Sequence, residues 1–300
     1  MRHDKRVLIS LRSEGAAVST TVSETPKTRW SLRTYRKPIK YVLVTVCLIG
    51  PFVYFFPKIA LFYAICGAYD VSRNTDLKFS TIKRYFTGNG VLVWMLSPIN
   101  ALLDLLSLPY INKGVYRLED FPPDYQKEIR HLLKVTDEAD LVRRLEERSK
   151  EHKRAMFFWR SYGRKFEGAV DVPAFDGPWK YVQTIGLSVF NKKTTTSPHF
   201  GWLRPTLRLL YNINDMKDKS SYIVVGATTN YWCENKLFIF DDTLLHVSAN
   251  ETDQLRYCMF VDVIRPALFP RVFSALIALE AYVTRKFQLI EYSGWTLVKR

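Results

Sequence analysis

The sequence PHFGWLRPTLRLLYNI, residues 198–213, decides how the C-terminal half of this 300-residue chain is interpreted. It contains His199, one of only five histidines, and Arg208 follows nine residues later on a run rich in Leu and Tyr. That run has the length and composition of a β-strand. Taken alone, such a histidine is more often structural than a metal ligand, and a strand arginine usually pairs with a nearby acid.

A second stretch, FDDTLLHVSANETDQLRYCMFVDVIRP at 240–266, repeats this order. Arg256 follows His246 by ten residues, again on an apolar run. These two stretches hold the only histidines of the section that begins near residue 158. The repeated pattern is more informative than either histidine alone.

The section around both stretches has the texture of a β domain. Short apolar runs alternate with turn signals: TIGLSVFN, LRLLYNI, SYIVVGA, KLFIFDD and YCMFVDVI. Evenly spaced short strands of this kind are typical of a sandwich, jelly roll or barrel. We therefore predict a mostly β domain, a double-stranded β-helix or jelly roll, with flanking helices and an N-terminal apolar helical region.

Composition divides the chain into five predicted segments. They are a basic cytoplasmic tail (1–40), an apolar membrane-associated region (41–112), a helical linker (113–157), the jelly-roll domain (158–270) and a C-terminal amphipathic helix with a tail (271–300).

The N-terminal segments indicate contact with a membrane. The first forty residues carry ten Lys or Arg against three acids, directly before a long apolar stretch, as expected for a cytoplasmic flank. No small-residue cleavage site follows, which argues against a signal peptide. The apolar runs near 41–69 and 85–111 approach the roughly 20 residues that a spanning helix needs. They could span as a hairpin, re-enter, or lie in the interface; a buried pair of core helices is the alternative.

The overall charge and the cysteines exclude other classes. The formal net charge is +15, which suits nucleic acid or an anionic lipid surface. The basic residues are dispersed and form no recognised nucleic-acid motif, so we expect no nucleic-acid partner. Four cysteines, with no CxxC pair, form neither a disulfide framework nor a zinc site. A reducing compartment is the simplest inference.

Taken together, the motifs resemble a known family. The run from Ser188 to Pro266 resembles the aspartyl/asparaginyl β-hydroxylases, which are iron(II)- and 2-oxoglutarate-dependent dioxygenases. The resemblance rests on the PH before a small residue, the LR nine positions on, the FDD…H turn, and the Arg ten positions later. Trp232 before a turn and the closing DVIRP match as well. More loosely, the apolar N-terminus and the LEDFPP linker are similar to the bacterial lipid A 2-hydroxylase branch.

The resemblance implies a role for each of these residues. His199 and His246 would bind Fe(II), which accepts imidazole and keeps open positions for cosubstrate and O₂. The far carboxylate of 2-oxoglutarate needs a cationic fork, which Arg provides and Lys does not. By resemblance, Arg256 and Ser188 would hold that carboxylate, and Arg208 would lie near the iron-binding end.

Position 201 departs from the commonest dioxygenase pattern. A facial triad would place an acid two residues after the first histidine, but Gly201 stands there. The animal β-hydroxylases also have Gly at this place and work with two histidines, whereas lipid-hydroxylating relatives often keep an acid. Asp241 or Asp242 could substitute as a ligand, although acids just before the second histidine are more often expected to orient it or to cap the turn.

These observations leave three functional hypotheses. The first is a membrane-associated Fe(II)/2-oxoglutarate dioxygenase that hydroxylates an acyl chain of a lipid A-like substrate, at the inner membrane with its catalytic domain facing the cytoplasm. The second keeps the chemistry but acts on Asp or Asn side chains of a protein, or on an amino-acid-containing lipid. The third is a non-catalytic, membrane-anchored jelly-roll binding module. The sequence leaves the oligomeric state open.

Overall fold

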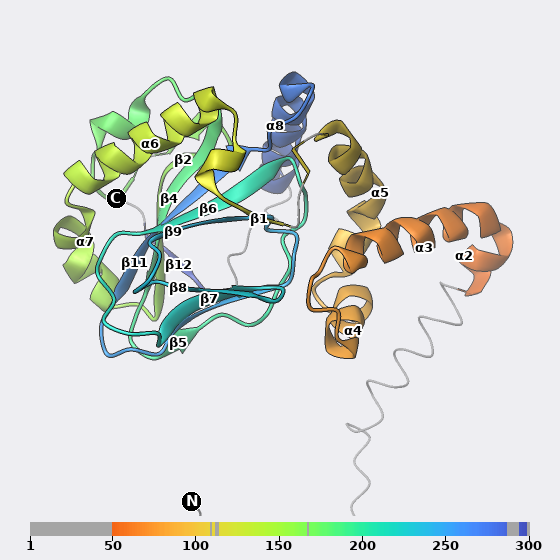
Figure 1. The fold of residues 1–300 in the computed structure, drawn as a ribbon, viewed down its shortest axis with the longest axis horizontal. Helices are drawn as coiled ribbons and strands as arrows, with labels where there is room; N and C mark the ends of the chain where they lie inside the picture. Colours follow the sequence, from red (N-terminus) through yellow and green to blue (C-terminus); the bar gives the residue numbers. More distant parts are fainter. Residues whose placement is uncertain (1–49, 109, 112–113, 167, 287–293, 299–300) are drawn as a thin grey trace, which may run out of the picture. The chain divides into compact units, whose positions relative to one another are not determined.

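Two antiparallel sheets face one another in the C-terminal part of the chain (Figure 1). The computed structural model describes residues 50–108, 110–111, 114–166, 168–286 and 294–298. The predicted basic tail (1–40) and the start of the predicted apolar region lie outside the described residues.

The larger sheet has eight strands in the order β1-β9-β6-β11-β4-β2-β12, with β3 paired to β2. All its pairs are antiparallel except β12 with β2. The central strands are buried on both faces, which explains their nearly continuous apolar sequences. The strands are β1 (Val115–Tyr116), β2 (Arg154–Ser161), β3 (Arg164–Lys165), β4 (Val182–Phe190), β6 (Thr206–Asn212), β9 (Leu237–Phe240), β11 (Arg256–Ile264) and β12 (Thr296–Leu297).

The smaller sheet has four strands in the order β5-β10-β7-β8. They are β5 (Thr194–Thr195), β7 (Ser221–Val225), β8 (Thr228–Tyr231) and β10 (His246–Asn250). A buried apolar cluster fills the space between the two sheets, with Ile223 and Trp232 on one side and Leu210, Phe240 and Cys258 on the other. The prediction of a mostly β domain with flanking helices is confirmed.

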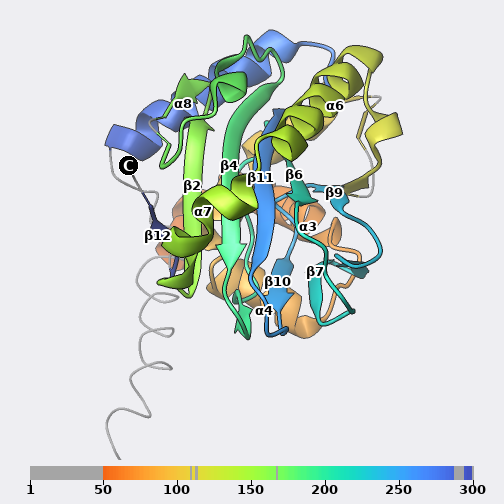
Figure 2. The ribbon, with the colours of Figure 1, turned by 90° about the vertical axis from the view of Figure 1, so that its left-hand side faces the viewer.

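Two helices cover the outer face of the larger sheet, as Figure 2 shows. They are α6 (Pro123–Glu138) and α7 (Leu141–Lys150); short 3₁₀ turns lie at Leu118–Asp120 and Pro173–Asp176. Ile129, Leu132 and Leu145 of these helices are fully buried against the outward side chains of β4, β6 and β11. The predicted linker 113–157 therefore supplies a layer of the domain, and its last residues already belong to β2.

A block of helices precedes the sheets. The block consists of α3 (Pro57–Ser72), α4 (Phe79–Thr87) and α5 (Val91–Leu106); the short helix α2 (Gly50–Phe55) comes before it. Pro98 lies inside α5, and the chain turns by 91° between α4 and α5. Among the described residues, no single helix is long and apolar enough to cross a membrane, while α4 and α5 together pass that length and composition test as a bent pair.

The outward faces of these helices are unusually apolar. On α5, Met95, Leu102 and Leu105 are each more than half exposed. On α3, Leu61, Phe62 and Ile65 are similarly exposed. Scattered exposed apolar residues are ordinary, but here large ones recur along two helices.

The inward faces of the same helices carry charge. Arg204, in the segment before β6, forms ion pairs with Asp70 of α3 and with Asp104 of α5, the latter at 2.9 Å. Asp241 accepts a hydrogen bond from Arg73 at 2.8 Å and forms an ion pair with Arg265 at 2.7 Å. We call this set of three arginines and three aspartates the ion network: Asp70, Arg73, Asp104, Arg204, Asp241 and Arg265. It joins the helical block to the β domain and explains the acids that interrupt the apolar runs.

The C-terminal helix α8 (Pro270–Lys286) lies beside α5 (Figure 1). Phe273 and Ile277 are buried against Leu103 of α5 and Ile264 of β11. Leu279 and Tyr282 of the same helix remain at least half exposed. The helix thus packs on the domain with one face and leaves an apolar strip on the other, as the sequence predicts.

Candidate active site

The two predicted metal-binding histidines lie directly opposite each other. His199 and His246 form an isolated antiparallel bridge, in which the backbone N–H of each donates to the carbonyl of the other at 3.0 Å. Residues paired in this way project to the same side, and the two ring centroids are 4.1 Å apart. Two side chains that are 47 positions apart in sequence therefore share one site.

Both rings are held by the same local contact. Nδ1 of His199 lies 2.8 Å from the Ser197 carbonyl, and Nδ1 of His246 lies 2.9 Å from the Leu244 carbonyl. A carbonyl only accepts, so each Nδ1 carries the hydrogen and each Nε2 presents its lone pair. Burial, with a further contribution from His199, lowers the pKa of His246 to about 4. A neutral imidazole with a fixed tautomer is the form that binds a metal.

An acid fills the space that a side chain at position 201 would need. A Cβ on Gly201 would overlap the carboxylate of Asp242, whose carbonyl also accepts from the Gly201 N–H at 2.8 Å. Asp242 Oδ1 lies 3.4 Å from Nε2 of His246. The carboxylate therefore faces the metal-binding nitrogen and not the Nδ1 that a purely orienting acid would contact. A side chain at position 201 and the Asp242 carboxylate would therefore compete for the same space.

Arg208 is held by carboxylates. Its Nε donates to Asp262 at 2.7 Å, and its Nη1 lies 3.2 Å from Oδ1 of Asp242. Its guanidinium also stacks on Phe260, 3.8 Å from the ring centroid. Burial opposes the charge on Asp242, but Arg208 and the two histidines together hold the pKa of Asp242 below its ordinary value. Arg208 thus fixes an ionised carboxylate beside the histidines.

Arg256 has a different environment. It is fully buried, donates to Ser248 Oγ at 3.0 Å and to the Ala249 carbonyl at 3.2 Å, and its Nε has no hydrogen-bond partner. Within the described part of the chain no carboxylate forms an ion pair with it. Burial lowers the pKa of Arg256 to about 10. A buried guanidinium without an anion is costly, so this site is suited to an anionic ligand.

Arg256 contacts the strand that begins with His246, β10. Ser248, which accepts from it, lies two residues after His246 on β10 and on the same face of that strand. Residues two apart on a strand are separated by about 6–7 Å. Ser188 is close by: its Oγ donates to the carbonyl of Cys258, two residues from Arg256, at 3.0 Å. Arg256 therefore contacts the same face of β10 that carries His246.

Aromatic rings pack against Arg256. The Arg256 guanidinium lies 3.9 Å from the ring centroid of Phe190 and 5.5 Å from that of Trp232. Trp232 is almost fully buried, and its indole N–H has no partner within the described residues. The rings exclude water from the cation and strengthen its attraction for an anion.

Glu280 of α8 lies near the part of the site that contains Arg208 and Asp262. Burial, together with Asp262 and Asp242, raises the pKa of Glu280 to about 8, and Tyr162 contributes a hydrogen bond. No local pattern around Glu280 distinguishes it from an ordinary acid on an amphipathic helix. Glu280 thus places an acid of α8 close enough to interact electrostatically with Arg208, Asp242 and Asp262.

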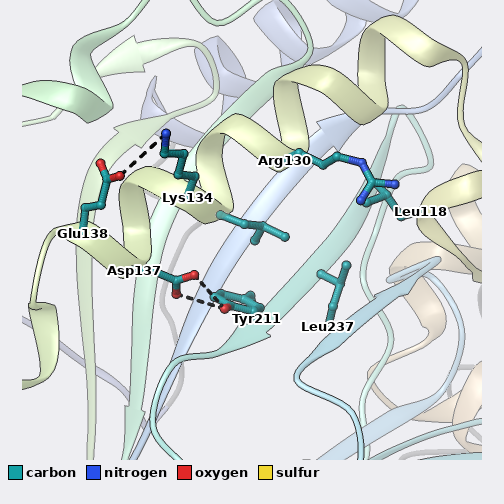
Figure 3. Close-up of a pocket in the computed structure, with 8 residues that line it drawn as sticks. Leu118, Arg130, Lys134, Asp137, Glu138, Tyr211 and Leu237 are labelled. Atoms are coloured by element: carbon teal, nitrogen blue, oxygen red, sulfur yellow. Dashed lines mark hydrogen bonds and ion pairs between the residues drawn. The ribbon is translucent and has the colours of Figure 1, made fainter.

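One surface depression lies away from the histidines. Figure 3 shows it between α6 and the edge of the larger sheet, where Tyr211 donates to Asp137 and Lys134 pairs with Glu138. Among the described residues, no group of three or more His, Cys, Asp or Glu side chains has the arrangement of a metal site. The metal hypothesis therefore rests on the two facing imidazoles and the adjacent Asp242.

The comparisons with known proteins agree with the class that this site suggests. Residues 124–266, just under half of the chain, match the family model for aspartyl/asparaginyl β-hydroxylase. The matched segment contains both histidines, Ser188, Arg208 and Arg256. The resemblance predicted from the sequence is confirmed: this segment is similar to the hydroxylase family.

One curated relative is more specific. The ornithine lipid ester-linked acyl 2-hydroxylase of Rhizobium tropici is 33% identical over 125 residues, which are 39% of this chain and 43% of that protein. The chain thus spans less than half the length of the relative that it matches.

Solved structures share only part of the strand arrangement. An oxidoreductase of the 2OG-Fe(II) oxygenase family from Burkholderia pseudomallei is 11% identical over 32% of this chain and 48% of its own, with a TM-score of 0.25. A cupin superfamily protein from Desulfitobacterium hafniense is 12% identical over 29% and 71%, with a TM-score of 0.22. Neither likeness bears on function.

Proposed function

We propose that this protein is an Fe(II)- and 2-oxoglutarate-dependent hydroxylase that acts on the acyl chain of a membrane lipid. The observation that carries the proposal is the combination of two facing imidazoles with a buried arginine that has no anionic partner among the described residues. This arginine, Arg256, donates to Ser248, which lies two residues after His246 on β10. The hydroxylase family match supports the reaction class.

The residues suit the cofactor and the cosubstrate. His199 and His246 would hold Fe(II), with Asp242 as the adjacent carboxylate. With 2-oxoglutarate, bound Fe(II) would supply the oxidation: one oxygen atom of O₂ would be inserted into a C–H bond, and the other would enter the new carboxylate of succinate as 2-oxoglutarate loses CO₂. Arg256 would bind the far carboxylate of 2-oxoglutarate, with Ser188 beside it, and the surrounding rings would exclude water.

A lipid substrate is supported by the surface next to the site. The exposed faces of α3, α5 and α8 are apolar, whereas their acids face inward. The exposed charges described on and beside the helices α3, α4 and α8 are mainly basic, and include Lys58, Lys78, Lys83, Arg84 and Arg271. Such a surface fits the interface of a bilayer that contains anionic lipids. We place the protein at the cytoplasmic face of the inner membrane, where Fe(II) and 2-oxoglutarate are available.

Two classes of lipid fit the proposed reaction. The name of the Rhizobium tropici relative favours the 2-position of an ester-linked acyl chain on an amino-acid-containing lipid. The basic surface is equally compatible with a phosphorylated, lipid A-like substrate. An Asp or Asn side chain of a protein is the competing substrate, supported by Gly at position 201.

Two measurements on the purified chain and on cells test the proposal. Cells carrying the wild-type gene, the His246→Ala gene or no gene are compared by mass spectrometry of lipid extracts; a gain of one oxygen on an acyl chain only with wild type is expected. In parallel, the wild-type protein with Fe(II), O₂ and 2-oxoglutarate should form succinate, and His246→Ala should form at least about 100-fold less. Succinate without any lipid change would favour a protein substrate; neither product would favour a non-catalytic module.

A further inference from the structure

The helical block reaches the two histidine segments with polar side chains. We propose that Asn74 and Asn100, on the membrane side of the molecule, are positioning residues that hold His246 and His199 for metal binding. The helices α3–α5 would then help to position the metal ligands in addition to contacting the membrane. This inference rests on the proposed function, because it assumes that the histidines hold a metal.

Asn74 holds the residue before His246. It lies just after α3 and is buried, with 3% of its surface exposed. Its Oδ1 accepts from the N–H of Leu245 at 2.8 Å, and its Nδ2 donates to the Val71 carbonyl at 3.1 Å. The bond to Val71 fixes the orientation of the amide, so the oxygen is directed at Leu245. The position of Leu245 in turn sets where β10 begins.

Asn100 holds the segment that follows His199. It lies on α5 and is fully buried. Its Nδ2 donates to the Trp202 carbonyl at 3.2 Å, and its Oδ1 accepts from the Arg204 N–H at 3.2 Å. One amide thus clamps the backbone on both sides of residue 203, only three to five residues after the histidine.

Helix α4 supports the same segment. Tyr85 packs edge-on against Phe200, the residue after His199, with ring centroids 5.7 Å apart. Arg84 donates to the carbonyl of Pro198, the residue before it, at 3.2 Å. The histidine is therefore held from the helical block on both sides.

Both hydrogen bonds described for the Asn100 side chain reach the segment after His199. The helix reads VLVWMLSPINALLDLL, in which Asn100 and Asp104 lie one turn apart on the same side. Asp104 binds Arg204 in the ion network, and Asn100 binds the backbone N–H of the same residue. A buried amide without hydrogen-bond partners would be unfavourable. The hydrogen bonds to the segment after His199 therefore make Asn100 acceptable on this face of α5.

The test is metal binding by the full chain in detergent micelles. Wild-type protein, Asn74→Ala and Asn100→Ala are titrated anaerobically with Co(II), and the visible absorption of the bound ion reports both the affinity and the ligand geometry. Removing a side chain that orients a ligand should weaken the affinity about 10- to 100-fold and alter the spectrum. Neither result depends on turnover.

Asn214→Ala is a matched control. Asn214 makes the same kind of clamp, accepting from the Tyr257 N–H at 2.8 Å and donating to the Leu255 carbonyl at 2.8 Å, but it acts on β11. Its loss should leave Co(II) affinity unchanged in the absence of 2-oxoglutarate. Asn74→Asp keeps the acceptor for Leu245 but loses the donor to Val71, so its Co(II) affinity should lie between those of wild type and Asn74→Ala.

The outcomes separate the two proposals. If wild type and His246→Ala bind Co(II) equally, the proposed function fails. If binding needs His246 but the asparagine variants bind as tightly as wild type, the positioning roles are overturned. If an alanine variant loses its fold, the decision passes to Asn100→Asp, which keeps only the acceptor: reduced affinity supports the proposal, and full affinity refutes it for Asn100.

Discussion

Buried arginines occur in two regions of this molecule, and their surroundings differ. In the ion network between the helical block and the β domain, Arg73, Arg204 and Arg265 meet three aspartates. In the space between the sheets, Arg256 has only a hydroxyl and a carbonyl as partners. In the first region, three aspartates balance the charge of the three arginines. In the second region, Arg256 has no anionic partner among the described residues, so an anion from outside the chain would balance its charge.

The difference separates a structural arrangement from a binding site. A complete set of buried charges is destabilised when one member is removed, but it needs no ligand. An incomplete set reduces the stability of the empty protein and increases the affinity for the missing ion. Arg208 is intermediate, since Asp262 and Asp242 neutralise it while one of them also faces the histidines.

The largest expected effect comes from breaking the complete set. Asp241→Asn removes the acid shared by Arg73 and Arg265, and leaves buried positive charge uncompensated. Burial alone would raise the pKa of Asp241, but the arginines hold it well below its ordinary value, so the carboxylate is ionised in the native protein. We expect the free energy of unfolding, measured with urea, to fall by about 3–5 kcal/mol.

Asp215→Asn is the control for that measurement. Asp215 also pairs with a cation, Lys236, but the pair is exposed to solvent. Its removal should not change the urea midpoint measurably. Equal midpoints for Asp241→Asn and wild type would mean that the ion network does not join the helices to the β domain.

The next effect sharpens the contrast at Arg256. Arg256→Met replaces the cation by an apolar side chain of similar length among Phe190 and Trp232. The protein should unfold at the same or a higher urea concentration, because an uncompensated charge is removed. Binding of 2-oxoglutarate, measured by calorimetry with a redox-inert metal, should weaken at least about 30-fold, since a charge-assisted contact is lost.

Arg256→Lys tests whether geometry matters in addition to charge. A lysine keeps the positive charge but lacks the planar fork, so its affinity for 2-oxoglutarate should lie between those of wild type and Arg256→Met. A strongly destabilised Arg256→Met protein with unchanged 2-oxoglutarate binding would show that Arg256 is structural, and the contrast between the two regions would disappear.

Much of the β domain and the core of the site could be predicted from sequence because they depend on local patterns. Short apolar runs give the strands, and the spacing of His199, Arg208, His246 and Arg256 indicates the shared site. The starts of the strands were less accurate: β2 begins at Arg154, because the apolar run AMFFW continues beyond the charged residues that precede it. The predicted segment boundary at residue 158 falls inside β2.

The ion network and the asparagine contacts could not be predicted. Asp70 and Asp104 interrupt apolar runs, and sequence alone cannot tell a solvated interruption from a buried pair. Their partner Arg204 is more than 90 residues away, and only the fold brings them together. The same holds for Asn74, whose contact with Leu245 spans 171 positions. Contacts of this range carry no periodic signal.

The smallest expected effect concerns the intermediate case, where a carboxylate serves both Arg208 and the histidines. Gly201→Ala places a Cβ against the Asp242 carboxylate and must displace it. Arg208 keeps Asp262, so the fold should be retained with a loss of about 1–3 kcal/mol, while Co(II) affinity falls about tenfold. The exchange Gly201→Asp with Asp242→Gly moves the acid to the place that other family members use and frees the space that it needs. It should bind Co(II) more tightly than Gly201→Asp alone. If Gly201→Ala and Asp242→Ala both bind Co(II) like wild type, the carboxylate serves Arg208 only, and the histidines act without an acid.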